Sequence, residues 1–203
     1  MTQPERHVLS IPSGAARTWQ PLRAEAGSRG DVPTTGLMRP GPVGLNPEPV
    51  RRKGVAPVAM TILQAGVDAQ VEKAEIIQGK MTEPSGPYVV AWYSDTGKIG
   101  QGTNMVFAGH LDYYEVGEAV FFHLTDLAEG DMILLTGDDG EPYSFRTEWI
   151  KTYTQDELDT ETVKGIVATT DTESVTLITC SGPFDFDNGI YHDRTVVRGN
   201  RID

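Results

Sequence analysis

The chain of 203 residues contains a single cysteine, Cys180. A lone cysteine excludes a disulfide within the chain, so this thiol is either a packed apolar group or a reactive one. Scarcity of cysteine does not fix the compartment, because it suits cytosolic proteins and the exported proteins of organisms that avoid disulfides. Cys180 is therefore the first residue to test for chemistry.

Long apolar runs are also absent from the sequence. No stretch approaches the roughly 18 consecutive apolar residues that a membrane-spanning helix requires. The segment from Met1 to His7 is polar and lacks the pattern of a secretion signal. Neither a membrane anchor nor a signal peptide is visible in this chain.

Positive charge is scarce beyond residue 57. Residues 1–57 hold eight Lys/Arg against four Asp/Glu, whereas residues 58–203 hold nine against twenty-five, for a formal total of −12. A segment this acidic would be repelled by a phosphate backbone, which excludes nucleic acid as a partner. It would tolerate cationic or amine-bearing partners much better.

The first 57 residues are rich in proline and glycine. They carry nine of the thirteen prolines and show neither helical nor strand periodicity. Proline cannot donate to a regular hydrogen-bond ladder, so residues 1–57 are predicted to form a disordered arm or spacer. The basic cluster 51–53 lies near its end.

From about Val58 the pattern changes to short apolar strands separated by turn residues, which predicts an all-β domain over 58–203 with a closed or nearly closed barrel. The aspartate and glycine residues at 138–140 predict a hairpin. Short helices are expected at Ala119–Leu127 and Asp156–Val163. The predicted strands are Val58–Leu63, Val67–Val71, Tyr88–Trp92, Met105–Ala108, Met132–Thr136, Tyr143–Thr154, Gly165–Ala168, Val175–Thr179 and Thr195–Val197.

Three chemically active residues lie at the ends of these strands. Strand alternation places Cys180 on one face with Thr176, at the end of the run 175–180. If that strand and the last strand are antiparallel neighbours, Arg194 returns beside Cys180. His110 follows the apolar run 105–109. A thiol, a base and a cation at strand ends are the groups that a cysteine acyl transferase requires.

These residues carry a resemblance to a known family. The sequence Thr-Leu-Ile-Thr-Cys at 176–180, the arginine that opens Arg-Thr-Val-Val at 194–197, and Gly109-His110 after an apolar strand resemble the sortases. Sortases are cysteine transpeptidases with an eight-stranded β-barrel, and residues 58–203 fit that layout. The segment that follows the cysteine looks most like class F, with class D or E as alternatives.

The resemblance implies a role for each residue. Cys180 would attack the carbonyl between Thr and Gly of an LPxTG-type sorting signal, and His110 would exchange protons with the leaving and entering amines. Arg194 would hold the substrate and stabilise the oxyanion, with support from Thr179. The resemblance implies no cofactor.

It also implies partners and a location. The acyl acceptor would be an amine of a cell-wall peptide or a pilin lysine. The full-length protein is expected at the extracellular face of the cell envelope, held by an anchor that this chain does not show.

Several alternatives remain open at the level of sequence. A cysteine at a strand end is commonly a small buried hydrophobe. Arg198 shares a face with Arg194 and is the next candidate for its role. His192 is close enough in sequence to line the same cleft, whereas His123, in an apolar run, is expected to pack in the core. Tyr113 or Tyr114 could line a groove for the peptide.

Other functions are also consistent with the pattern. A zinc site could combine Cys180 with His110, Asp112 and His192, but the spacing matches no compact ligand motif, and no metal is predicted. The enzyme could release its acyl group to water as a hydrolytic cysteine peptidase. The domain could also be a non-catalytic barrel that binds peptides.

Overall fold

The computed structural model describes residues 53–203. The arm predicted for residues 1–57 therefore lies outside the described residues, apart from its end at 53–57. Within the described part, no helix is long and apolar enough to cross a bilayer.

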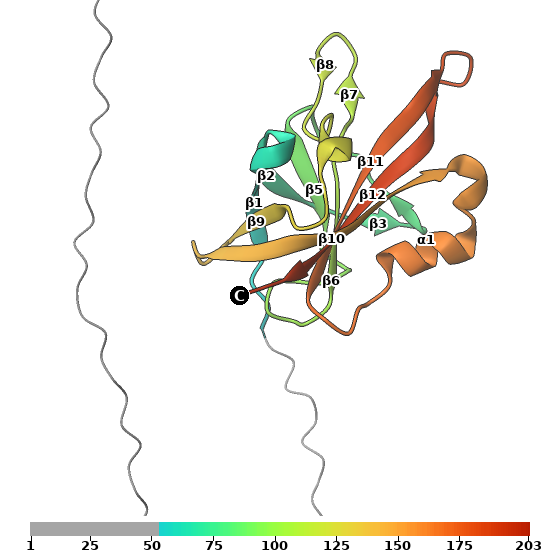
Figure 1. Ribbon diagram of the computed structural model, residues 1–203. Coiled ribbons are helices and arrows are strands. Elements are labelled where there is room, and N and C mark those ends of the chain that lie inside the picture. The colour runs from blue at the N-terminus through green and yellow to red at the C-terminus, as the bar shows by residue number, and fades with distance from the viewer. Residues whose placement is uncertain (1–52) are drawn as a thin grey trace, which may run out of the picture. The chain divides into compact units, whose positions relative to one another are not determined.

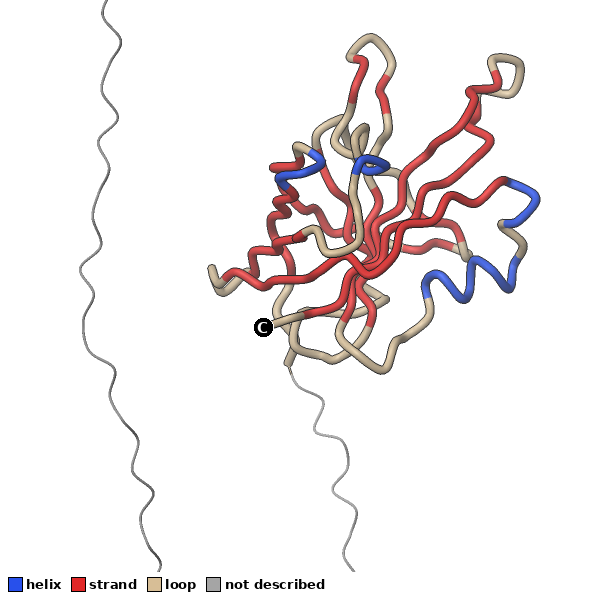
Figure 2. Tube along the Cα trace, viewed as in Figure 1, coloured by secondary structure: helices blue, strands red, loops and turns tan. Residues whose placement is uncertain are grey.

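The described residues form mainly β-structure (Figures 1 and 2). Twelve strands are joined by three 3₁₀ helices and one α-helix. In chain order the elements are β1 (Pro57–Ile62), η1 (Leu63–Ala65), β2 (Val67–Ala74), β3 (Ile76–Ile77), β4 (Lys80–Met81), β5 (Val89–Tyr93), β6 (Asn104–Ala108), β7 (Asp112–Tyr113), β8 (Gly117–Glu118), η2 (Leu124–Asp126), β9 (Met132–Gly137), β10 (Pro142–Thr154), η3 (Gln155–Glu157), α1 (Thr160–Val167), β11 (Ser174–Asp185) and β12 (Ile190–Arg201).

Eight of the strands close into a barrel in the order β1-β2-β5-β6-β11-β12-β10-β9. The pairs β2–β5 and β6–β11 are parallel and the remaining neighbours are antiparallel. The predicted closed barrel is confirmed. The hairpin at 138–140 is also confirmed, because Gly140, at φ +82°, donates its amide to the Gly137 carbonyl (2.9 Å) between β9 and β10.

The barrel interior is filled by the inward face of each strand. On β11, Val175 and Leu177 are fully buried in the main core with Phe107 and Val197. Ile178 packs instead in a second apolar cluster on the other face, and Cys180 follows it on that face. The alternation predicted for 175–180 thus places the thiol outside the barrel core.

Helix α1 corrects one predicted strand, because Gly165–Ala168 lies in and directly after this helix. The helix begins at the N-cap Asp159, whose carboxylate accepts the Thr162 amide (2.7 Å). Its buried residue Ile166 faces the barrel, and the Ile166 carbonyl accepts a hydrogen bond from the Arg198 guanidinium (2.9 Å). The run at 165–168 therefore forms the end of a helix in which Ile166 is buried, a distinction that periodicity cannot make at this length.

The helix predicted at Ala119–Leu127 is reduced to the single 3₁₀ turn η2. The amide of Val120 donates to the Pro87 carbonyl (2.8 Å), and that of Phe121 donates to the His110 carbonyl (3.0 Å). These tertiary hydrogen bonds hold the segment beside His110, where residues 120–123 form turns that lead into η2.

Candidate active site

Cys180 and Arg194 are direct cross-strand neighbours. Cys180 on β11 is paired with Arg194 on β12 in an antiparallel register that continues from Ser174 to Ser181. Directly opposed residues in such a pair hold their side chains on the same face. The neighbour relation predicted from the sequence is therefore present in the structure.

Arg198, the alternative to Arg194, lies elsewhere. It pairs with Thr176, is buried, and donates to the Ile166 carbonyl beneath helix α1. Burial lowers the pKa of the Arg198 guanidinium, although Glu148 and Tyr153 oppose that effect. Arg198 thus anchors the helix and does not share the position of Arg194 beside the thiol.

His110 is fixed by the residue that precedes it. The Gly109 amide donates to the Ile178 carbonyl (3.2 Å), and the Thr179 hydroxyl donates to the Gly109 carbonyl (2.9 Å). Two hydrogen bonds thus clamp the end of β6 against β11, one residue before His110 and one residue before Cys180. A side chain at Gly109 would meet Phe121 at 2.5 Å, so only glycine allows this close approach.

The imidazole of His110 contacts a loop and an aromatic ring. Its Nε2 lies 3.2 Å from the Pro84 carbonyl, which can only accept, so this nitrogen carries a hydrogen. The ring of Tyr113 meets the imidazole edge-on, with the centroids 5.3 Å apart. The loop itself is held by Tyr93, whose hydroxyl donates to the Thr82 carbonyl (2.8 Å).

A cavity of about 330 Å³ joins these groups. The thiol, the imidazole and the guanidinium all line it, together with an apolar wall and one carboxylate. The lining residues are Met81, Thr82, Glu83, Pro84, Tyr93, Ala108, Gly109, His110, Ile178, Thr179, Cys180 and Arg194. The structure thus brings together all four residues that the sequence selected, Thr179 included.

Opposing influences act on the pKa of the Cys180 thiol. Burial raises the pKa of the Cys180 thiol, the Arg194 guanidinium lowers it in part, and the carboxylates of Asp112 and Glu83 raise it further. The protonated thiol is therefore the main form at neutral pH. Arg194 is the cation that favours the thiolate.

The Arg194 guanidinium is oriented by main-chain carbonyls. Its Nη1 donates to the carbonyl oxygens of Tyr191 and Asp193, both at 2.8 Å. A guanidinium carries five N–H donors in a planar fork, so these two bonds orient the group without using all of its donors.

Tyr191 is a site residue that the sequence analysis did not select. Its hydroxyl donates to the carboxylate of Asp112, two residues after His110. Burial, followed by this hydrogen bond, raises the pKa of Tyr191 to about 12. Asp112 was considered only as a metal ligand, and nothing in the spacing of 112 and 191 indicates that the two side chains meet.

The two other histidines of the described part, His192 and His123, do not line the thiol cavity. His192 does not line the thiol cavity but a neighbouring one that it shares with Tyr191 and Arg194, and its Nε2 lies 3.9 Å from an Asp185 carboxylate oxygen. His123 was expected in the core, but half of its side chain is exposed, with Nδ1 2.8 Å from Asp126. Across residues 53–203, no three His, Cys, Asp or Glu side chains gather closely enough to hold a metal.

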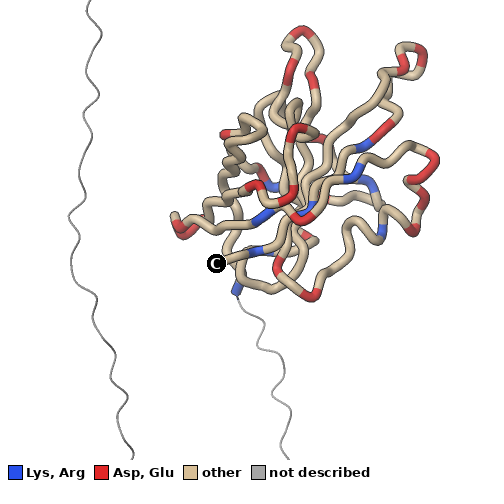
Figure 3. The backbone as a smooth tube through the Cα atoms, viewed as in Figure 1, with Lys and Arg blue, Asp and Glu red and all other residues tan. Residues whose placement is uncertain are grey.

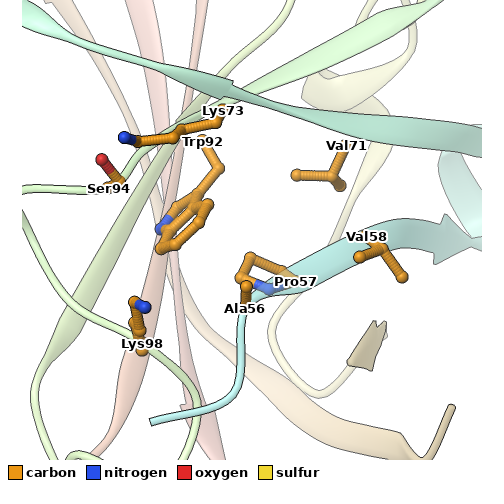
Figure 4. Close-up of a pocket in the computed structure, with 8 residues that line it drawn as sticks. All are labelled: Ala56, Pro57, Val58, Val71, Lys73, Trp92, Ser94 and Lys98. Carbon is orange, nitrogen blue, oxygen red and sulfur yellow. The ribbon is translucent and has the colours of Figure 1, made fainter. Parts of the chain in front are cut away.

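A second cavity, of about 420 Å³, lies on the other face of β5 (Figure 4). Tyr93 lines the thiol cavity, whereas Trp92, the preceding residue, lines this one with Lys73, Ser94 and Lys98. It holds no cysteine, histidine or carboxylate. The groups needed for acyl transfer are therefore confined to the first cavity.

A closed β-barrel with a thiol, an imidazole and a guanidinium around one external cavity defines the class of protein. Residues 60–202 match the sequence model of the Sortase domain, and the chain belongs to the sortase family. Sortases are cysteine transpeptidases that act on sorting-signal substrates at the surface of the cell envelope. The sequence resemblance is thereby confirmed at the level of the family.

Solved sortase structures share the fold. Sortase A of Listeria monocytogenes is 22% identical with a TM-score of 0.54, covering 73% of this chain and 88% of that one. Sortase D5 transpeptidase of Clostridium perfringens is 18% identical with a TM-score of 0.52, covering 74% and 79%. A lid mutant of Corynebacterium diphtheriae sortase A is 19% identical with a TM-score of 0.55, covering 76% and 74%. A search of curated proteins gave no match.

Proposed function

We propose that the cavity around Cys180 is the active site of a transpeptidase that cleaves an LPxTG-type sorting signal between Thr and Gly. The observation that carries the proposal is the pairing of Cys180 with Arg194 across β11 and β12, with His110 in the same cavity. The apolar wall that includes Ala108 and Ile178 suits the apolar residues of an extended peptide. Class F membership remains a prediction.

The first half-reaction forms a thioester. The Cys180 thiol passes its proton to His110, the resulting thiolate adds to the threonine carbonyl, and the remaining N–H donors of Arg194 stabilise the oxyanion. The C–N bond then breaks, and His110 gives a proton to the departing glycine amine. The Thr179 hydroxyl is already donated to Gly109, so any oxyanion support from Thr179 comes from its main chain.

The second half-reaction regenerates the free enzyme. An incoming amine loses a proton to His110 and attacks the thioester, forming an amide bond and releasing the Cys180 thiolate. The acceptor is an amine of a cell-wall peptide or a pilin lysine. The excess of Asp and Glu over Lys and Arg along the described domain favours a cationic amine over an anionic acceptor (Figure 3).

We extend the proposal to the roles of the two parts of the chain. Residues 58–203 act as the catalytic domain, and residues 1–57 act as a spacer that ends close to the basic cluster at 51–53. The catalytic domain works at the extracellular face of the cell envelope, where the full-length protein is anchored. The supporting observation is that all barrel strands lie between Pro57 and Arg201.

Turnover of a peptide tests the function. The protein is incubated with a labelled LPxTG-type peptide and an oligoglycine amine, and ligated and hydrolysed products are separated by chromatography. We expect ligated product from the wild type and none from Cys180→Ala. The circular dichroism spectrum of the variant should match that of the wild type. Retention of most turnover in the variant would refute the mechanism. Amine-independent hydrolysis would support a peptidase, and binding without turnover would support a peptide-binding barrel.

A further inference from the structure

We propose that the hydrogen bond between Tyr191 and Asp112 is a tether that fixes Arg194 relative to His110. This inference rests on the proposed function, because it assigns Tyr191 and Asp112 as positioning residues for that reaction. Neither residue lines the thiol cavity, so their proposed role is to position Arg194 and His110, and the charge of Asp112 acts separately on the Cys180 thiol.

The tether joins two separate hairpins. Asp112 begins β7, two residues after His110, and Tyr191 lies on β12, three residues before Arg194. The β7–β8 hairpin and the outer end of the β11–β12 hairpin project side by side from the same end of the barrel (Figure 1). The Tyr191 hydroxyl donates to the Asp112 carboxylate across the space between them. Among the described residues, no other hydrogen bond joins 112–118 to 181–193.

Tyr191 also holds the guanidinium directly. Its carbonyl oxygen accepts a hydrogen bond from Arg194 Nη1 (2.8 Å), while its hydroxyl reaches the hairpin that follows His110. One residue therefore contacts both Arg194 and the hairpin that follows His110. A displacement of Tyr191 would move a main-chain acceptor that orients Arg194.

Both ends of the tether are supported. The Tyr191 ring lies against Phe184 across the hairpin, with the centroids 4.9 Å apart. At the other end, Asp112 pairs with Glu118 in the β7–β8 ladder, and the Ala119 amide donates to the Leu111 carbonyl (3.0 Å). The bond thus links two anchored elements, which is the arrangement that lets one hydrogen bond restrict their relative motion.

The reaction requires this restriction. Arg194 must meet the oxyanion that forms on the carbonyl attacked by Cys180, and His110 must reach the leaving amine of the same peptide. A misplacement of about 1 Å in such a site can lower a rate by about 100-fold. The outer end of a long hairpin would otherwise move with few contacts to the barrel.

Tyr191→Phe tests the tether, because it removes only the hydroxyl and keeps the ring against Phe184. We expect kcat to fall about ten- to one hundred-fold with little change in KM. Tyr88→Phe is the matched control, since this tyrosine is 61% exposed and lies outside both hairpins. Equal kinetics in Tyr191→Phe and the wild type would overturn the proposal.

Two variants of Asp112 distinguish loss of the hydrogen bond to Tyr191 from loss of the carboxylate charge. Asp112→Asn keeps an oxygen that accepts the Tyr191 hydrogen bond, whereas Asp112→Ala removes it. We expect a several-fold larger loss of kcat in Asp112→Ala than in Asp112→Asn, and no further loss when Tyr191→Phe is added to Asp112→Ala. Equal losses in the two Asp112 variants, or additive losses in the double variant, would contradict the tether.

Alkylation of Cys180 by iodoacetamide distinguishes this inference from the proposed function, because it needs no peptide. If Arg194 loses its orientation, the thiolate loses its nearby cation, so the alkylation rate of Tyr191→Phe at neutral pH should fall several-fold. Tyr88→Phe should react like the wild type. An unchanged rate in Tyr191→Phe would count against the tether even if no sorting-signal peptide were turned over.

Discussion

At the scale of single residues, the thiol of Cys180 is subject to two opposing influences. Burial favours the neutral thiol, and the Arg194 guanidinium favours the thiolate. Burial has the larger effect, and Asp112 and Glu83 reinforce it. The nucleophile is therefore scarce at neutral pH and becomes more abundant as the pH rises.

The first prediction follows from the raised pKa of the Cys180 thiol. Because the pKa of Cys180 lies above its ordinary value, the rate of alkylation should increase with pH through neutrality and continue to rise into the alkaline range. Iodoacetamide labelling quenched at timed intervals, followed by mass spectrometry, measures the alkylation rate of Cys180 at each pH. A plateau already reached at neutral pH would show that the thiolate is stabilised more strongly than the structure indicates.

Arg194 provides a second prediction at this scale. Arg194→Lys keeps the charge but cannot reproduce the planar fork that bonds two carbonyls and still faces the cavity. We expect kcat/KM to fall by at least about 100-fold, the range for loss of an oxyanion donor. The control is Arg146→Lys, an exposed arginine on β10. Near-normal kinetics in Arg194→Lys would remove Arg194 from the oxyanion role.

At the scale of elements, Asn104 connects three parts of the structure. From β6, its side-chain amide donates to the Ile166 (3.3 Å) and Ala168 (3.0 Å) carbonyls at the end of α1. Its side-chain oxygen accepts from the Thr176 hydroxyl on β11 (2.7 Å). Asn104 is almost completely buried, so no water can replace these bonds without rearrangement.

Removing this connection should destabilise the domain. Asn104→Ala leaves the buried Thr176 hydroxyl without its acceptor and removes the donor to the Ala168 carbonyl, and we expect the free energy of unfolding to fall by about 2–4 kcal/mol. Urea unfolding followed by circular dichroism measures the difference. Asn188→Ala, at the exposed turn of the β11–β12 hairpin, should cost less than about 1 kcal/mol. Equal costs for the two variants would show that α1 is held by other contacts.

The barrel strands and helix α1 differ in how far the sequence could predict them. The barrel was predictable because its strands are short, apolar and separated by turn residues, and the strand ends carrying Cys180, Arg194 and His110 followed from alternation. Helix α1 was misjudged at its end, because its docking depends on Asn104 and Arg198, which lie far away in sequence. The contact between Asp112 and Tyr191 was out of reach for the same reason, since it arises only from the barrel closure.

At the scale of the whole molecule, closure of the barrel supports the site. The hydrogen bonds of Glu173 secure the barrel end opposite the thiol, where its carboxylate accepts from the Gly100 and Gly102 amides (2.9 Å each) and pairs with Arg201 (2.6 Å). The other end carries the cavity and the two projecting hairpins, both bearing acidic residues (Figure 3). Rigid strands thus place the three reactive groups, and the hairpins border them.

The most direct test of the account is a search for the covalent intermediate. Wild-type protein and Cys180→Ala are mixed with an LPxTG-type peptide, and intact masses are measured with and without an oligoglycine amine. We expect an adduct of the peptide up to its threonine on the wild type alone, mapped to Cys180 and discharged by the amine into a ligated product. An adduct of the same mass on Cys180→Ala, or ligated product formed without an adduct at Cys180, would contradict it.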